Sequence, residues 1–334
     1  MRLCGGSGFF KRAVSGGAAL LLAVALTGSL PVRAAGERML VPVGHTVGIK
    51  LFARGVVVAK LPDGRTPARA CGLRAGDVIL SCDGREVTST EQFQRLLQER
   101  GEEGARLEVQ RSRRRLELPV EPTRNEQGVY CIGAWVRDSM AGIGTMTYYD
   151  PADGSFGALG HGITDVDTAL LMPFSNGSIL PSAVKAVKRG AVGSAGELRG
   201  RFDLTGDLGP LYANTSQGIF GKLTGTERPS GKPVPVGEAA VGPATILANV
   251  EGDEVKTYAV EILEADPHDP MGHHLLLAVK DAELLSKTGG IVQGMSGSPI
   301  MQKGKLVGAV THVLLNDPTK GYGISMDSML KAAE

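Results

Sequence analysis

The stretch Gly294-Met295-Ser296-Gly297-Ser298-Pro299 places a serine between glycines, in a turn that a proline closes before an apolar strand. Glycines adopt backbone conformations that other residues resist, and they leave the path to the hydroxyl open. Such a turn can expose Ser296 Oγ and aim successive N–H groups at a developing oxyanion. We expect Gly294 and Ser296 to supply those N–H groups. A glycine-rich turn with two solvated serines fits the same six residues, so the remaining chain must supply a base and an acid.

A second glycine-rich turn carries the candidate base. His161, one of six histidines, lies in Gly160-His161-Gly162-Ile163-Thr164-Asp165 after an apolar run. A neutral imidazole within hydrogen-bonding reach can accept the proton of a serine hydroxyl. The alternative is a turn histidine without a chemical role.

Three aspartates are candidates for the acid that would orient this imidazole. Asp281 ends an apolar run ahead of Ser296, and a carboxylate held by a rigid strand end suits an orienting role. Asp281 could equally cap a short helix over 282–285, since Asp is favoured at that position. Asp165 and Asp167, next to the histidine turn, stay open as alternatives.

Length and composition favour a mainly β protein of two domains or three small ones. The chain has 334 residues, of which 47 are glycine and 4% are aromatic, a composition that fits small β domains with many tight turns. The net charge of +1 gives no strong positive electrostatic field that would attract nucleic acid, so we predict no nucleic-acid partner. We also predict no cofactor and no metal.

Residues 1–35 are typical of an export signal. Arg2, Lys11 and Arg12 precede an apolar run from Ala18 to Leu30, and small residues near Ala34 offer a cleavage site. The apolar run is short for a membrane-spanning helix, although an uncleaved anchor is the alternative. In either case we expect the rest of the chain to lie outside the cytoplasm.

Residues 40–122 are predicted to form a compact module. It contains the strand run 55–59, the turn Gly72-Leu73-Arg74-Ala75-Gly76-Asp77, a hairpin turn at Asp83-Gly84 and a helix behind a capping box of Thr88 and Glu91. This order closely resembles a bacterial PDZ domain. The resemblance implies a groove in which an extended peptide adds as a strand, with its terminal carboxylate bound by the loop Val47-Gly48-Ile49-Lys50.

Residues 123–334 are predicted to form a second β domain. Many short β-like runs with Gly and Pro between them indicate a barrel or sandwich, and Asp327 to Ala333 indicates a short terminal helix. The chain order His161, Asp281, Ser296 is that of chymotrypsin-type double β-barrel proteases. The nucleophile loop resembles theirs as well, with Met295 and Ser298 standing where those proteases have Asp and Gly.

Together these features resemble one family, the stage IV sporulation protein B serine peptidases. The resemblance implies the catalytic residues His161, Asp281 and Ser296. It also implies a signalling protease exported across the forespore membrane into the space between the two membranes. The implied substrate is the inhibitory membrane subunit of an intramembrane protease complex, whose cleavage would release activation of the late mother-cell sigma factor precursor. Self-cleavage near the N-terminus, between Ala34 and Pro42, is implied too.

Two rival interpretations and the cysteine pairing stay open. A PDZ adaptor with a second domain that only binds would need no triad. A zinc site from His268, Asp269, His273 and His274 is disfavoured because adjacent histidines on a strand point to opposite faces. Beyond the signal, a Cys71–Cys82 bridge and buried free thiols are both compatible with the spacing.

Overall fold

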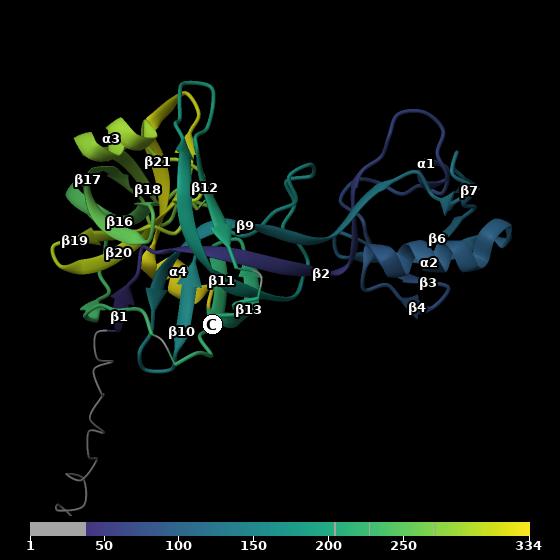
Figure 1. The fold of residues 1–334 in the computed structure, drawn as a ribbon, viewed down its shortest axis with the longest axis horizontal. Coiled ribbons are helices and arrows are strands. Elements are labelled where there is room, and N and C mark those ends of the chain that lie inside the picture. Colours follow the sequence, from purple (N-terminus) through teal and green to yellow (C-terminus); the bar gives the residue numbers. More distant parts are fainter. Residues whose placement is uncertain (1–37, 204, 227, 271) are drawn as a thin grey trace, which may run out of the picture. The chain divides into compact units, whose positions relative to one another are not determined.

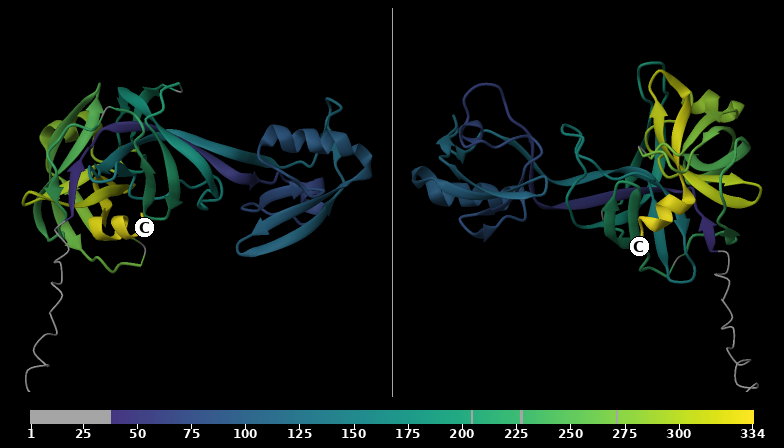
Figure 2. Two further views of the ribbon diagram at one scale, coloured as in Figure 1. Left: turned by 90° about the horizontal axis from the view of Figure 1, so that it is seen from below. Right: turned by 180° about the vertical axis from the view of Figure 1, so that it is seen from behind.

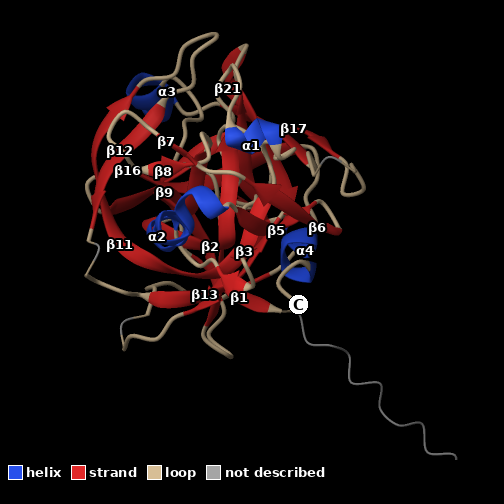
Figure 3. Cartoon of the chain, turned by 90° about the vertical axis from the view of Figure 1, so that its right-hand side faces the viewer, coloured by secondary structure: helices blue, strands red, loops and turns tan. Residues whose placement is uncertain are grey.

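The computed structural model describes residues 38–334 except 204, 227 and 271, so the expected export segment lies outside the described residues. Strands dominate that part of the chain, and helices are few and short (Figure 3). Within this part, no helix has the length and apolar character needed to cross a bilayer. The prediction of a mainly β chain is confirmed.

The first barrel closes because β2 pairs with β11 on one edge and with β9 on the other. Between those two partners the sheet continues through β10, β14 and β13. The six strands are β2 (Thr46–Lys60), β9 (Trp135–Tyr149), β10 (Ser155–Ala158), β14 (Gly218–Lys222), β13 (Gly209–Thr215) and β11 (Phe174–Lys188). Three further strands extend this sheet: β1 (Met39–Pro42) pairs with β9, β15 (Val234–Pro235) pairs with β1, and β12 (Glu197–Phe202) pairs with β11.

The second barrel is closed and consists of six antiparallel strands (green to yellow in Figure 2). In barrel order they are β16 (Gly242–Glu251), β17 (Glu254–Ala265), β18 (Leu275–Val279), β21 (Asp317–Ser325), β20 (Lys305–Leu314) and β19 (Pro299–Gln302). Alternating apolar residues such as Ile246, Tyr258 and Leu277 fill its interior. Helix α3 (Ala282–Thr288) follows β18, and α4 (Met326–Lys331) confirms the predicted terminal helix. The predicted double barrel is therefore present.

The PDZ module lies between β2 and β9 in the sequence, and it begins and ends on these two strands of the first barrel. The carboxyl half of β2 pairs with β3 and with the start of β9. The module's other elements are α1 (Pro67–Ala70), β3 (Val78–Cys82), β4 (Arg85–Glu86), α2 (Thr90–Arg100), the 3₁₀ turn Gly101–Glu103, β5 (Ala105–Arg111), β6 (Arg114–Val120), β7 (Thr123–Arg124) and β8 (Tyr130–Cys131). Phe93, Leu96 and Leu97 of α2 enter its core, as the helical spacing predicts.

The expected carboxylate-binding loop is instead a strand. Val47, Gly48, Ile49 and Lys50 lie within β2, where Gly48 faces Ile143 of β9 and Leu180 of β11. Because both edges of this segment are paired, its N–H groups belong to the barrel ladders and do not form a free binding loop. Residues 46–53 therefore belong to the first barrel, whereas the PDZ core begins at Val56.

Several local predictions can be compared with the structure directly. The Asp83-Gly84 turn is confirmed, with both residues at positive φ between β3 and β4. The helix cap is Ser89, whose hydroxyl accepts from Gln92 N–H at 3.1 Å, and not Thr88. Cys71, Cys82 and Cys131 are free thiols, so the Cys71–Cys82 bridge is absent among the described residues.

Candidate active site

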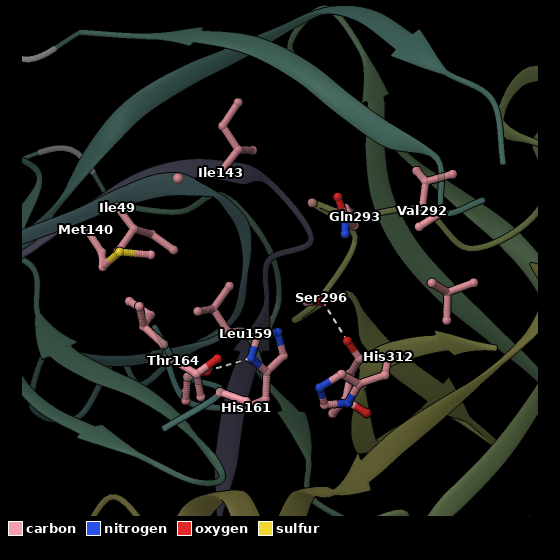
Figure 4. A pocket seen from close by; sticks show the side chains of 18 of the residues that line it. Ile49, Met140, Ile143, Leu159, His161, Thr164, Val292, Gln293, Ser296 and His312 are labelled. Atoms are coloured by element: carbon pink, nitrogen blue, oxygen red, sulfur yellow. Dashed lines mark hydrogen bonds between the residues drawn. The ribbon is translucent and has the colours of Figure 1, made fainter. Parts of the chain in front are cut away.

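One cavity of about 790 Å³ is lined by residues of both barrels, and it brings together two of the three predicted catalytic residues. His161 follows β10 of the first barrel, and Ser296 precedes β19 of the second. Figure 4 shows both side chains at this cavity, with His312 beside them. The cavity therefore contains the candidate base and the candidate nucleophile.

The histidine turn is held in an uncommon backbone conformation. Leu159 has a φ of 69° although it is not glycine, a geometry that costs on the order of 1–2 kcal/mol. Leu159 N–H donates to Thr145 O at 3.1 Å, and Gly160 N–H donates to Ala158 O at 2.9 Å. These bonds fix the chain direction just before His161, and the bond to Thr145 O attaches the turn to β9 of the barrel.

The serine turn is anchored on the same residue of β9. Thr145 N–H donates to Ser296 O at 2.9 Å, and Thr145 Oγ1 donates to Gly294 O at 2.8 Å. A Cβ at Gly297 would lie 2.0 Å from Thr145 O and 2.6 Å from Leu159 N, so only glycine fits there. Thr145 thus joins both turns, and nothing in its sequence context distinguishes it from other strand threonines.

His161 is oriented by a backbone carbonyl. Its Nδ1 lies 2.8 Å from Gly162 O, and because a carbonyl only accepts, Nδ1 carries the hydrogen. In the neutral ring the lone pair then lies on Nε2, the atom that can accept a proton. Burial lowers the pKa of His161, outweighing the hydrogen bond to Gly162, and keeps the imidazole neutral near pH 7.

The Ser296 hydroxyl is hydrogen-bonded but not to the histidine. Ser296 Oγ donates to Thr311 O at 2.6 Å (Figure 4). Rotation about the Ser296 Cα–Cβ bond moves the hydroxyl from this position to the other staggered positions. In the described part of the chain, the N–H groups of Gly294 and Ser296, the expected oxyanion donors, have no acceptor.

None of the three candidate aspartates is bonded to His161 in the described structure. Asp281 caps α3, with Oδ1 accepting from Leu284 N–H at 3.0 Å and Oδ2 from Ala259 N–H at 3.3 Å, and it does not line the cavity. Asp165 and Asp167 both pair with Arg137. Of the two interpretations of Asp281, the structure displays the helix cap.

His312 is a cavity residue whose importance the sequence did not indicate. Its ring centroid lies 4.8 Å from that of His161. His312 directly follows Thr311, whose carbonyl oxygen accepts the hydrogen bond from Ser296 Oγ. Burial, with smaller contributions from His161 and His273, lowers the pKa of His312 to about 4. Both rings at the cavity are therefore uncharged at neutral pH.

The two adjacent histidines of the alternative zinc site contact different partners. His274 Nδ1 accepts from Ser325 N–H at 3.2 Å, whereas the His273 ring stacks on Tyr322 with centroids 3.9 Å apart. Over residues 38–334, leaving aside the three undescribed positions, no group of three or more His, Cys, Asp or Glu side chains is arranged to hold a metal.

The double barrel with a serine and a histidine at its shared cavity defines the class as a serine peptidase with a PDZ module. The family described as SpoIVB peptidase S55 matches residues 128–330, well over half of the chain, and a PDZ domain family matches residues 61–111. The chain belongs to the SpoIVB peptidase S55 family. This confirms the resemblance seen in the sequence.

Individual relatives match smaller parts of the chain. Two putative zinc metalloproteases from strains of Xylella fastidiosa are each 32% identical over 79 residues, which is 23% of this chain and 17% of theirs. The chain therefore matches about a sixth of the length of these curated relatives. Among solved structures, the active form of the Rv3671c protease of M. tuberculosis is 12% identical, covers 58% of this chain and 73% of its own, and has a TM-score of 0.32. The PDZ domain of an SdrC-like protein from Listeria monocytogenes is 22% identical, covers 25% of this chain and 87% of its own, and has a TM-score of 0.23.

Replacing Thr145 with valine tests whether this residue holds the serine turn. Thr145→Val leaves Gly294 O without its donor, so we expect a loss of about 1–3 kcal/mol in the free energy of unfolding in urea. Thr147→Val is the matched control, because Thr147 is buried on the same strand and its hydroxyl has no partner in the described structure. Equal effects of both substitutions would contradict an anchoring role.

Replacing Asp281 with asparagine separates its two interpretations. Asn caps a helix about as well as Asp, so the observed contacts predict a kcat within about tenfold of wild type. Removal of the acid charge from a working triad lowers kcat by about 10⁴-fold. A loss of that size, with normal thermal stability, would show that Asp281 orients His161 after a rearrangement. Asp281→Ala is the control for capping, and we expect it to cost about 1 kcal/mol of stability.

Proposed function

We propose that the chain is an exported serine endopeptidase in which Ser296 is the nucleophile and His161 the general base. The observation that carries the proposal is that both side chains line one cavity between the barrels, with His161 Nε2 free to accept a proton. Because serine is a weak nucleophile at neutral pH, it needs such a neighbouring base.

The proposed reaction begins with rotation of the Ser296 hydroxyl from Thr311 O toward His161 Nε2. Oγ then bonds to the scissile carbonyl carbon while its proton passes to Nε2, and the carbonyl oxygen becomes an oxyanion. The unpaired N–H groups of Gly294 and Ser296 are the donors for this charge. The imidazolium next gives its proton to the leaving amine, and water, deprotonated by the same ring, releases the acyl group from Ser296.

The proposal for the biological substrate is supported by family membership. The S55 family match supports a role in sporulation signalling, in which the peptidase cleaves a membrane-bound inhibitory subunit of an intramembrane protease complex. That cleavage would trigger activation of the late mother-cell sigma factor precursor. We place the enzyme in the space between the forespore and mother-cell membranes, with self-cleavage near its N-terminus. The PDZ family match supports binding of peptide termini.

Covalent labelling of Ser296 tests the proposed activity. We expect a fluorophosphonate to label the wild-type protein, and Ser296→Ala to abolish labelling and lower peptide cleavage by at least about 10³-fold. Ser298→Ala is a matched control in the same turn, because Ser298 Oγ is buried without a partner in the described structure. Unchanged cleavage by Ser296→Ala would assign the activity to another site, and a protein that is neither labelled nor active would instead be a binding protein with a PDZ module.

The pH dependence of kcat/KM tests His161 as the base. Because burial lowers its pKa, the ring stays neutral below the usual titration point near 6.5, and activity should persist as the pH falls through 6.5. The acidic limb of the kcat/KM profile should therefore have its midpoint below pH 6.5. A midpoint above 6.5 would indicate a base stabilised in its charged form, as an imidazole paired with a carboxylate would be.

A further inference from the structure

The cavity that holds His161 and Ser296 is lined entirely by residues without formal charge. No Asp, Glu, Lys or Arg is among its described lining residues, although charged residues make up 21% of the chain. Ligand pockets are mostly apolar but usually hold a few polar or charged groups that fix orientation, and here none of those groups in the described structure carries a formal charge. The exclusion of charge is therefore a property of this cavity and not of the chain as a whole.

Aliphatic side chains from both barrels form the walls. Ile49, Met140 and Ile143 come from β2 and β9 of the first barrel, and Figure 4 shows them at the cavity with His161 and Ser296. Val292 and Val313 contribute from the second barrel. A substrate segment that fills this space exchanges water for apolar contact over much of its length.

The rim carries two leucines that a folded chain would normally bury. Leu171, from the segment after the histidine turn, is 43% exposed, and Leu315, between β20 and β21, is 55% exposed. They come from different barrels and line the same cavity. Exposed large apolar residues beside a cavity are typical of a surface that a partner covers.

We propose that this cavity selects substrates whose side chains next to the scissile bond are uncharged and mainly apolar, with Leu315 and Leu171 as specificity-determining residues. The inference rests on the proposed peptidase function and names its substrate class. A charged side chain would lose its hydration in the cavity without gaining a partner, which is costly. An apolar side chain gains favourable contacts when it is buried in the cavity. The cavity therefore discriminates mostly by disfavouring charged side chains.

The neutral state of the two cavity histidines agrees with this environment. His161 and His312 both have lowered pKa values because burial penalises their charged forms. The surroundings that disfavour an imidazolium disfavour a substrate ammonium or carboxylate in the same way.

Cleavage-site profiling of the full-length protein with a library of mixed-sequence peptides tests the proposal. We expect peptides with Asp, Glu, Lys or Arg on either side of the cleaved bond to react at least about tenfold more slowly than those with Leu, Val or Met there. Cleavage of charged peptides at equal rates, by a protein that a fluorophosphonate labels at Ser296, would overturn this inference and leave the peptidase function intact. Absence of both labelling and cleavage would overturn the peptidase function, and this inference with it.

A charge introduced at the rim gives a second, independent readout. Leu315→Lys should raise the relative rate for peptides with Glu at the cleavage site by about fivefold, because the new ammonium supplies the missing partner. Leu315 is more than half exposed, so the fold should tolerate lysine. Val241→Lys is the matched control, since Val241 is 67% exposed and does not line the cavity. If Leu315→Lys leaves the preference between charged and apolar peptides unchanged, and the wild type tolerates charge as well, Leu315 does not determine specificity.

Discussion

The site depends on one strand residue, Thr145, whose backbone and side chain bind two turns that are far apart in sequence. Its carbonyl accepts from Leu159 ahead of the histidine, its N–H donates to Ser296 O, and its hydroxyl holds Gly294 O. Backbone groups in a buried position must be paired, so these bonds are costly to break and geometrically restrictive. The position of the His161 turn relative to the Ser296 turn is thereby tied to a single residue of the first barrel.

Local signals in the sequence were sufficient to single out His161 and Ser296 as candidate site residues. Glycines flanking His161 and Ser296 mark turns that keep a side chain accessible, and the structure places both residues at one cavity. Short β-like runs likewise predicted a mainly β chain with a barrel or sandwich, and the resemblance to chymotrypsin-type proteases implied the double barrel. These features depend on short-range geometry, which a sequence displays directly.

Features decided by tertiary pairing could not be read in the same way. Val47 to Lys50 has a composition that fits a loop edge or a strand, and only its pairing with β9 and β11 distinguishes the two. The sequence around Asp281 fits both an acid that orients His161 and a helix cap, and its carboxylate accepts from the N–H groups of Leu284 and Ala259. Thr145 and His312 gave no signal, because their roles arise from neighbours more than a dozen residues away.

The two long strands β2 and β9 belong to the first barrel at one end and to the PDZ module at the other (Figure 1). The matched S55 region starts at residue 128, yet the barrel it contributes to is completed by β2, which precedes the PDZ module in sequence. The module is therefore an insertion within the peptidase fold and not a separate domain that precedes it. An N-terminal truncation that removes the module therefore also removes β2, a strand of the first barrel. An excision that leaves both strands intact must fall between the end of β2 at Lys60 and the start of β9 at Trp135.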